Sequence, residues 1–216
     1  MNLRLLATIS LAAISGWGQV PSGRWDGTIV FGTLKVPFRI HFEGSGTTVS
    51  GSFENGDARV HSNSGSFANG ELRLSFEEIS TRLEAFAVAG GDLKGTYGGP
   101  KLGTLPFTAA AYCTCGSEGE AGPEIMGTWT VPEAGWRLII QRKGEDTLAT
   151  LSRPEGSLGP LNGRFDGVSF MLHYFDGSRA ALLEIEPRKD NGLDLIWKAP
   201  GEDAKKHTAV RAKDQQ

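Results

Sequence analysis

Hydrophobic and polar residues alternate in short runs along most of this chain. Leu72, Leu74 and Phe76, for example, are separated by the single polar residues Arg73 and Ser75. A period of two places successive side chains on opposite faces, so each run predicts a half-buried β-strand. The same pattern recurs in both halves, with Val168 expected to point inward. It predicts a core that includes Trp25, Phe38, Ile40, Leu72, Leu74, Phe76, Trp129, Trp136, Leu138, Phe170, Leu172, Leu183, Ile185 and Trp197.

The runs end at glycine-rich steps that favour tight turns, such as Ala68-Asn-Gly70 and Asp190-Asn-Gly192. Successive runs are only about 10 to 15 residues apart, which leaves no room for a crossover helix. After the N-terminal segment, no stretch of the sequence has a sustained helical period. The pattern therefore predicts an all-β fold, an antiparallel meander of about 10–12 strands.

A phrase of glycine, one residue and an aromatic residue recurs along the chain. Glycine allows close approach or a bend of the backbone, and the aromatic side chain two residues later lies on the same strand face. This combination is typical of short, strongly curved strands in a compact sheet. The six copies are Gly23-Arg-Trp25, Gly51-Ser-Phe53, Gly65-Ser-Phe67, Gly95-Thr-Tyr97, Gly127-Thr-Trp129 and Gly163-Arg-Phe165.

Several motifs recur in the same order in the two halves, which indicates an internal duplication. Gly23-Arg-Trp25 matches Gly127-Thr-Trp129, and Thr81-Arg82-Leu83 matches Ser178-Arg179-Ala180. The halves can form one continuous barrel or a pair of small barrel-like units, and the pattern leaves both open. The expected divisions are a first β repeat at 19–112, a connection at 113–123, a second β repeat at 124–200 and a polar tail at 201–216.

The first 18 residues have the features of a secretory signal peptide. Arg4 provides a positive charge, residues 5–14 are largely apolar, and the small residues Gly16 and Gly18 follow. The apolar run is too short for a membrane-spanning helix, and no later run is long enough. We therefore expect an exported protein, periplasmic or secreted, with no membrane span.

The charge of the chain is mildly acidic, with a formal net charge of −3. Nucleic-acid binding needs a basic surface, so the composition argues against a nucleic-acid partner. The one basic cluster lies in the expected tail and is predicted to be solvated. It consists of Lys205, Lys206, Arg211 and Lys213.

The two cysteines, Cys113 and Cys115, are the redox candidates. In an exported protein they are expected to be oxidised, and three interpretations compete: a local disulfide, a redox-active pair, and half of a metal site. The four histidines have no metal-binding spacing, and His41 and His173 fall on predicted outward faces. The sequence thus predicts no metal and no cofactor.

Trp25 and Trp129 are the ligand candidates. A G-x-W opening strand also occurs in calycin-type ligand-binding barrels such as lipocalins and avidins, although this analogy rests on one short motif. Each tryptophan can seal the floor of a barrel or contact a bound ligand.

A further set of motifs resembles a known family. The motifs are Gly23-Arg-Trp-Asp-Gly27, Val36-Pro-Phe-Arg-Ile40, Leu93-Lys-Gly-Thr-Tyr97, Trp136-Arg-Leu-Ile139, Leu161-Asn-Gly-Arg-Phe165 and Arg179-Ala-Ala-Leu-Leu-Glu184. Together they resemble the β-rich region that precedes the thioredoxin-like domain in exported TlpA-type thiol–disulfide proteins. The C-x-x-C motif of that family is not in this sequence, so disulfide reduction is carried over to no residue.

The resemblance implies an exported, non-catalytic β module that is accessory to a thiol–disulfide redox system. The expected partner is an exported thioredoxin-like protein or a small apolar ligand. Two alternatives stay open at this point. One is a thiol–disulfide oxidoreductase that uses Cys113 and Cys115, and the other is a calycin-like carrier of a small ligand.

Overall fold

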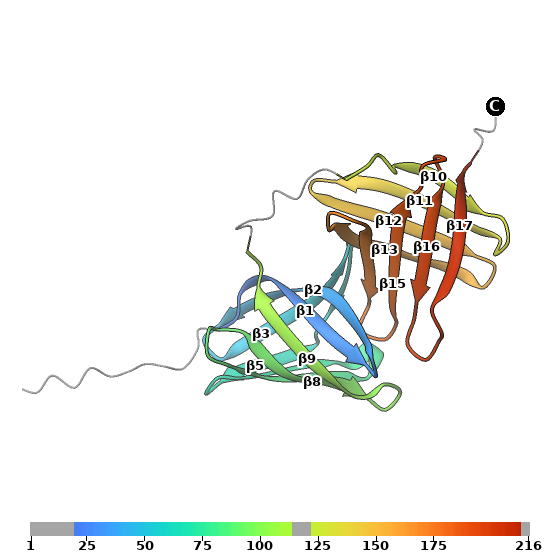
Figure 1. Cartoon of the computed structure of the whole chain (residues 1–216). Coiled ribbons are helices and arrows are strands. Elements are labelled where there is room, and N and C mark those ends of the chain that lie inside the picture. Colours follow the sequence, from blue (N-terminus) through green and yellow to red (C-terminus); the bar gives the residue numbers. More distant parts are fainter. Residues whose placement is uncertain (1–19, 114–121, 213–216) are drawn as a thin grey trace, which may run out of the picture.

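The computed structural model describes residues 20–113 and 122–212, and its strands form two antiparallel β-barrels (Figure 1). The prediction of an all-β fold is confirmed, and of the two arrangements that the sequence leaves open the chain adopts the pair of barrel-like units. In the described part of the chain there are seventeen strands, more than the number expected.

The first barrel is an up-and-down meander that closes through the pairing of β1 with β9. Strand β4 lies outside the closed ring, because it pairs only with β3. The elements are β1 (Gly23–Phe31), β2 (Leu34–Ser45), β3 (Thr48–Asn55), β4 (Ala58–His61), β5 (Ser64–Ala68), β6 (Glu71–Phe76), the 3-10 turn η1 (Glu77–Ile79), β7 (Thr81–Ala87), β8 (Leu93–Gly99) and β9 (Gly103–Ala111).

The second barrel is a closed ring of eight strands in sequence order. Each strand pairs with the next, and β10 pairs with β17 to close the ring. The strands are β10 (Gly127–Val131), β11 (Trp136–Lys143), β12 (Asp146–Arg153), β13 (Gly156–Phe165), β14 (Phe170–Phe175), β15 (Ala180–Pro187), β16 (Leu193–Lys198) and β17 (Lys205–Arg211).

The two halves are similar at the positions that the sequence matches. Trp25 in β1 lies opposite Ile40 in β2, and Trp129 in β10 lies opposite Leu138 in β11. Each tryptophan thus lies on the opening strand of its barrel. In both barrels its cross-strand neighbour is the aliphatic residue that follows the arginine of the repeated motif. Gly127, in the opening strand, has a φ of +124°, which an L side chain rarely adopts.

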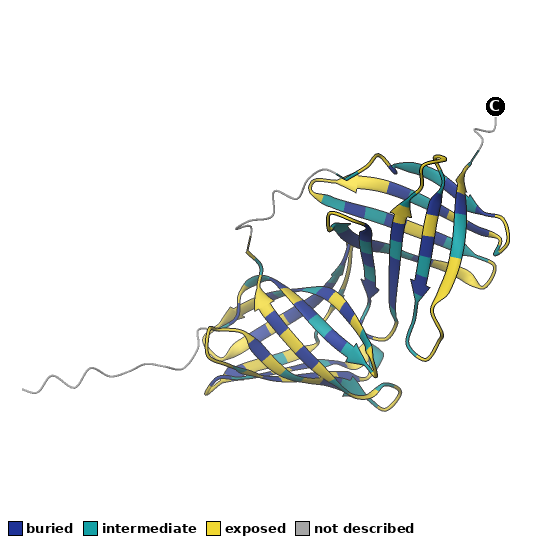
Figure 2. Cartoon of the chain, viewed as in Figure 1, coloured by how far each residue is buried: buried dark blue, intermediate teal, exposed yellow. Residues whose placement is uncertain are grey.

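Inward and outward positions alternate along the strands, as Figure 2 shows. Every residue of the predicted core is buried, none more than 7% exposed. Val168 is the exception among the inward predictions, because it is 75% exposed. It precedes β14 in a turn where the Asp166 carboxylate accepts hydrogen bonds from the backbone N–H groups of Val168 and Ser169.

The predicted polar tail at 201–216 is wrong for residues 205–211, which form β17. Only Ala209 of this strand is fully buried, so its sequence lacks the apolar alternation that marks the others. Pairing with β10 and β16 satisfies its backbone, and Arg211 packs its guanidinium over the Trp129 ring, 4.5 Å from the centroid. The free edges of its neighbours, and not its own hydrophobicity, make this segment a strand.

Truncation after Pro200 is therefore expected to unfold the second barrel, whereas removal of a solvated tail would change nothing. The loss of β17 leaves β10 and β16 with open edges and uncovers Trp129. Near-ultraviolet circular dichroism and urea unfolding of the truncated chain measure this effect. Truncation after Ala212, which removes none of the described residues, is the matched control and should leave both signals unchanged. Equal unfolding curves for the two truncations would contradict the assignment.

The barrels are joined by an aromatic side chain of the second barrel that enters the core of the first. Phe175, the last residue of β14, is 1% exposed and belongs to the hydrophobic cluster of the first barrel. Its ring centroid lies 5.0 Å from that of Phe53, 5.5 Å from that of Phe38 and 5.5 Å from that of Tyr97. Phe175 therefore acts as a plug in the mouth of the first barrel.

Polar groups hold the backbone around this plug. The Asn55 side-chain amide donates to the carbonyl of Phe175 at 2.7 Å and accepts from its N–H at 3.2 Å. The Tyr97 hydroxyl donates to the carbonyl of Gly177 at 2.6 Å. Gly177 has a φ of +89°, and a Cβ there would lie 2.4 Å from the side chain of Ile79, so the close approach requires glycine.

A charged cluster also crosses the junction. Arg39 of β2 forms a two-pronged ion pair with Asp146 of β12, with one contact at 2.6 Å, and Arg164 of β13 donates to the same carboxylate at 3.1 Å. Arg164 donates in addition to the hydroxyl of Tyr112, on whose ring Arg24 stacks at 3.9 Å. The two barrels are thus fastened by an apolar plug and by a largely buried ion-pair network.

His41 and His173 point away from their own barrels as predicted, but the second barrel's His173 is covered at the junction. Its Nε2 atom has no hydrogen-bond partner among the described residues and is inaccessible to water. Burial lowers the pKa of His173 to about 3, and the nearby charge of Arg39 acts in the same direction. His173 is therefore neutral at physiological pH.

Candidate functional site

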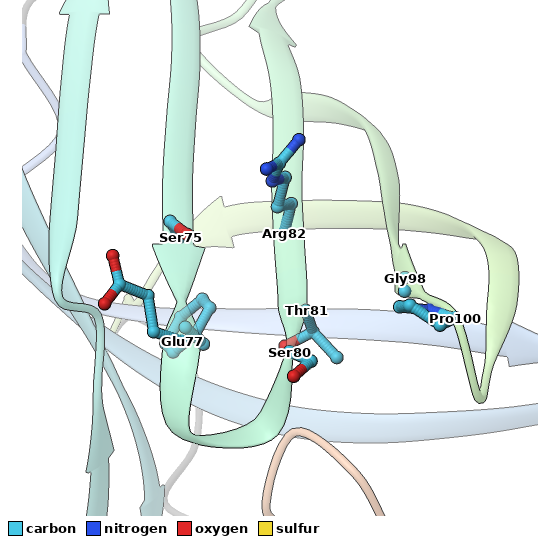
Figure 3. A pocket seen from close by; sticks show the side chains of 9 residues that line it. Ser75, Glu77, Ser80, Thr81, Arg82, Gly98 and Pro100 are labelled. Carbon is cyan, nitrogen blue, oxygen red and sulfur yellow. The ribbon is translucent and has the colours of Figure 1, made fainter.

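The candidate site is a hollow on the outer wall of the first barrel, centred on Arg82 (Figure 3). Arg82 is an outward-facing residue of β7, between the inward-facing Thr81 and Leu83. In register it lies between Ser75 of β6 and Gly98 of β8. Figure 3 shows its side chain rising between Ser75 on one side and the Gly98–Pro100 turn on the other.

Two glycines make the wall hollow beside Arg82. A Cβ at Gly98 would lie 1.9 Å from the carbonyl oxygen of Gly103, and one at Gly99 would lie 2.2 Å from that of Ser80. No side chain therefore fits at either position without a shift of the backbone. The surface next to the guanidinium consists of main chain at a point where other strands carry side chains.

The hollow has a volume of about 490 Å³ and is bordered by two further depressions of about 550 and 290 Å³. Arg82 lines all three. Hydroxyl groups surround it, since Ser75 and Ser80 line the main hollow and Ser64, Ser66 and Thr104 line its neighbours. Arg73, Glu77 and Glu84 also line these hollows, so Arg82 lies among small hydroxyl groups, exposed backbone and charges of both signs.

The floor of the hollow is connected to the junction between the barrels. Thr81, which lines the hollow, has its hydroxyl 2.6 Å from that of Tyr97. The Tyr97 proton is donated to Gly177, so Thr81 must be the donor to Tyr97. Burial raises the pKa of Tyr97 and outweighs the hydrogen bond with Thr81, which lowers it, while the Asp176 charge adds a smaller rise. Tyr97 is therefore neutral, and its hydroxyl links Thr81 in the hollow to Gly177 of the second barrel.

Arg82 is an exposed cation that pairs with no carboxylate in the described part of the chain. Over residues 20–113 and 122–212, no hydrogen bond or ion pair of its guanidinium is found. Its sequence counterpart in the second half differs in this respect, because Arg179 donates to Asp176 at 2.8 Å and to the Tyr174 hydroxyl at 2.9 Å. Arg179 lies in the turn before β15, whereas Arg82 lies within β7, so the two arginines match in sequence but not in strand position.

An open guanidinium beside hydroxyl and backbone groups can bind an anion. The fork matches a carboxylate or a phosphate in a bidentate arrangement, and hydroxyls can donate to the remaining oxygens. Arg82 is not among the site residues that the sequence predicts. The signal available was the Gly98-Gly-Pro100 step after the inward-facing Tyr97, together with the loss of an acidic partner relative to the second half.

The predicted ligand candidates lie in the barrel cores. Trp25 is 6% and Trp129 is 2% exposed, and neither lines a described hollow. Both indole N–H groups donate to nearby backbone carbonyls, that of Trp25 to Ser22 at 3.1 Å and that of Trp129 to Ile125 at 2.8 Å. This arrangement fits the sealing interpretation.

The redox candidates are only partly described. Cys113 is exposed and follows β9 and Tyr112 at the end of the first barrel. Cys115 lies outside the described residues, so the pairing of the two cysteines stays a prediction. In the described part of the chain, no group of three or more histidine, cysteine, aspartate or glutamate residues could hold a metal ion.

The described part of the chain contains no helix that is long and apolar enough to cross a membrane. No protein-family model matches the chain, and no curated protein matches it. Among solved structures, a protein of unknown function from the DUF3598 family of Nostoc punctiforme is similar over 88% of this chain and 96% of its own. The two are 14% identical, with a TM-score of 0.29, and this likeness carries no functional argument.

Proposed function

We propose that this protein is a non-catalytic exported binding module whose hollow at Arg82 holds an anionic group of its ligand or partner. The observation that supports the proposal is the exposed guanidinium of Arg82, which has no partner among residues 20–113 and 122–212 and lies in a hollow with glycine backbone and serine hydroxyls. The guanidinium of Arg82 is thus available to an external anion, whereas that of the sequence-matched Arg179 pairs with Asp176.

The export of the protein and its redox neighbourhood rest on the sequence. The signal-like segment at 1–18 supports a periplasmic or secreted location, and the resemblance to the β-rich region of TlpA-type proteins supports an exported thioredoxin-like partner. A small apolar ligand inside a barrel is the weaker proposal. The first barrel is filled by rings in mutual contact, among them Phe38, Phe53 and Phe175.

Titration with small anions tests the proposed site. The Nε–Hε resonance of Arg82 and the amide of Gly98 are expected to shift and saturate as acetate or phosphate is added at constant ionic strength, because both anions can bridge the fork. Arg82→Gln should weaken this response at least about tenfold, the equivalent of about 1.4 kcal/mol. Nuclear magnetic resonance of the ¹⁵N-labelled full chain measures both.

The matched control is Arg137→Gln, since Arg137 is an exposed strand arginine on the second barrel. This variant should leave the Arg82 response unchanged. An equal response to chloride, or a response that survives in Arg82→Gln, would show that the hollow has no anion site.

A further inference from the structure

We propose that the ligand of this site is an extended polypeptide segment of a partner, which lies over the outward face of β7. This inference rests on the proposed function and names the chemistry of the ligand. The outward residues of β7 and of the turn after it are Arg82, Glu84, Phe86 and Val88, in that order. We refer to these four residues as the β7 track.

The β7 track has a charged end and an apolar end. Alternate residues of a strand are about 6.6 Å apart, so Arg82 and Phe86 are separated by about 13 Å. Phe86 is 55% and Val88 is 42% exposed, and these are two of the four large hydrophobic residues that are exposed in the described part of the chain. These two residues follow Arg82 and Glu84 on the same face, so they provide the apolar contact of the proposed surface.

The charges of the track favour a ligand of mixed charge. Glu84 follows Arg82 on the same face, and the described residues provide no ion pair to it, since its neighbour Arg73 pairs with Glu71. A uniformly anionic chain, such as an acidic polysaccharide, would bring like charge close to Glu84, and this is unfavourable. A polypeptide can place an acidic residue over Arg82, a basic one over Glu84 and an apolar one over Phe86.

The backbone of the wall determines how the segment docks. β7 is paired on both sides, with β6 and with β8, so it has no free edge to which a strand could add. The segment must therefore lie face-on and be recognised through its side chains. Specificity then depends on the spacing of alternate residues, which in an extended segment equals that of the track.

Synthetic peptides test the inference. The probes are fluorescein-labelled nonapeptides that carry aspartate, lysine and leucine at alternate positions, made in both sequence directions, with a scrambled peptide of the same composition. Fluorescence anisotropy with the full chain should show that one direction binds at least about tenfold more tightly than the scrambled peptide. Arg82→Glu should abolish this preference, and replacement of the peptide aspartate by lysine should restore it, because reversal of both charges recreates the pair.

Phe86→Ala should weaken the binding of the preferred peptide several-fold, while Arg137→Glu on the second barrel should leave it unchanged. Equal binding of scrambled and ordered peptides would overturn the inference, as would tighter binding of an oligogalacturonate than of any peptide. If acetate and phosphate still saturate Arg82 in that case, the anion site stands and only the polypeptide ligand is wrong. If acetate and phosphate also fail to bind at Arg82, the proposed function is wrong as well.

Discussion

Phe175→Ala is expected to destabilise the first barrel by about 3–5 kcal/mol, although the residue belongs to the second barrel. The substitution removes a 1% exposed ring from a cluster that contains Phe38, Phe53 and Tyr97, and leaves a cavity at the mouth of the barrel. The barrels should also unfold in two separate transitions, because the main apolar link between them is lost. Urea unfolding followed by tyrosine and tryptophan fluorescence measures both effects.

Phe86→Ala is the control for this prediction. It is the same chemical change on the outer wall of the same barrel, at a residue that is 55% exposed. Its effect should stay within about 0.5 kcal/mol, as is usual for surface substitutions. Phe175→Leu should retain most of the stability, since leucine fills much of the cavity. If Phe175→Ala and Phe86→Ala have equal effects, Phe175 does not act as a plug.

Asp146→Asn is expected to cost about 3 kcal/mol, because it leaves two largely buried arginines without their shared counter-ion. The side chains of Arg39 and Arg164 are 13% and 26% exposed, and both donate to this carboxylate. Chemical denaturation at pH 7 measures the loss. The matched control is Asp57→Asn, which also removes an ion pair between the barrels, that with Lys143, but at an exposed position. It should have no measurable effect.

The ion pairs of Asp146 also predict how the difference in unfolding free energy between wild type and Asp146→Asn depends on pH. Burial opposes the ionisation of Asp146, but hydrogen bonds and charge from Arg39 and Arg164 outweigh it and lower the pKa of the carboxyl below 3.8. A lowered pKa in the folded state stabilises the protein above the unfolded-state pKa, and this contribution is lost as the pH falls through the folded-state value. The stability difference should therefore be constant from about pH 7 to 5 and shrink below about pH 4. A difference that grows on acidification would contradict the ion pair.

The sequence determined the local architecture of both barrels. The alternation of hydrophobic and polar residues identifies the inward face of each strand without knowledge of its partners. For this reason the core assignment is correct for residues as distant as Ile40 and Trp197. The order of the repeated motifs also indicated two halves, and Trp25 and Trp129 face equivalent residues in the two barrels. Turn signals between runs were sufficient for the meander, because strands that follow one another in sequence pair in both sheets, except that β5 pairs with β3 and not with β4.

Other features depend on contacts between segments that are remote in sequence. β17 is a strand only because β10 and β16 offer open edges, and its own side chains give no sign of it. Phe175 follows the inward-facing Tyr174 in β14, and its ring is buried in the core of the other barrel. His173 was expected on an outward face, and the opposite barrel covers it.

The candidate site belongs to this second group. In the sequence, Arg82 is one of many charged residues on outward strand positions. Its importance comes from what lies across the sheet, namely a glycine in register on one side and a serine on the other, and from the lack of an ion pair to its guanidinium among the described residues. A linear sequence determines the face on which a side chain lies, but only the registered pairing of strands determines whether a neighbour fills the space or neutralises the charge.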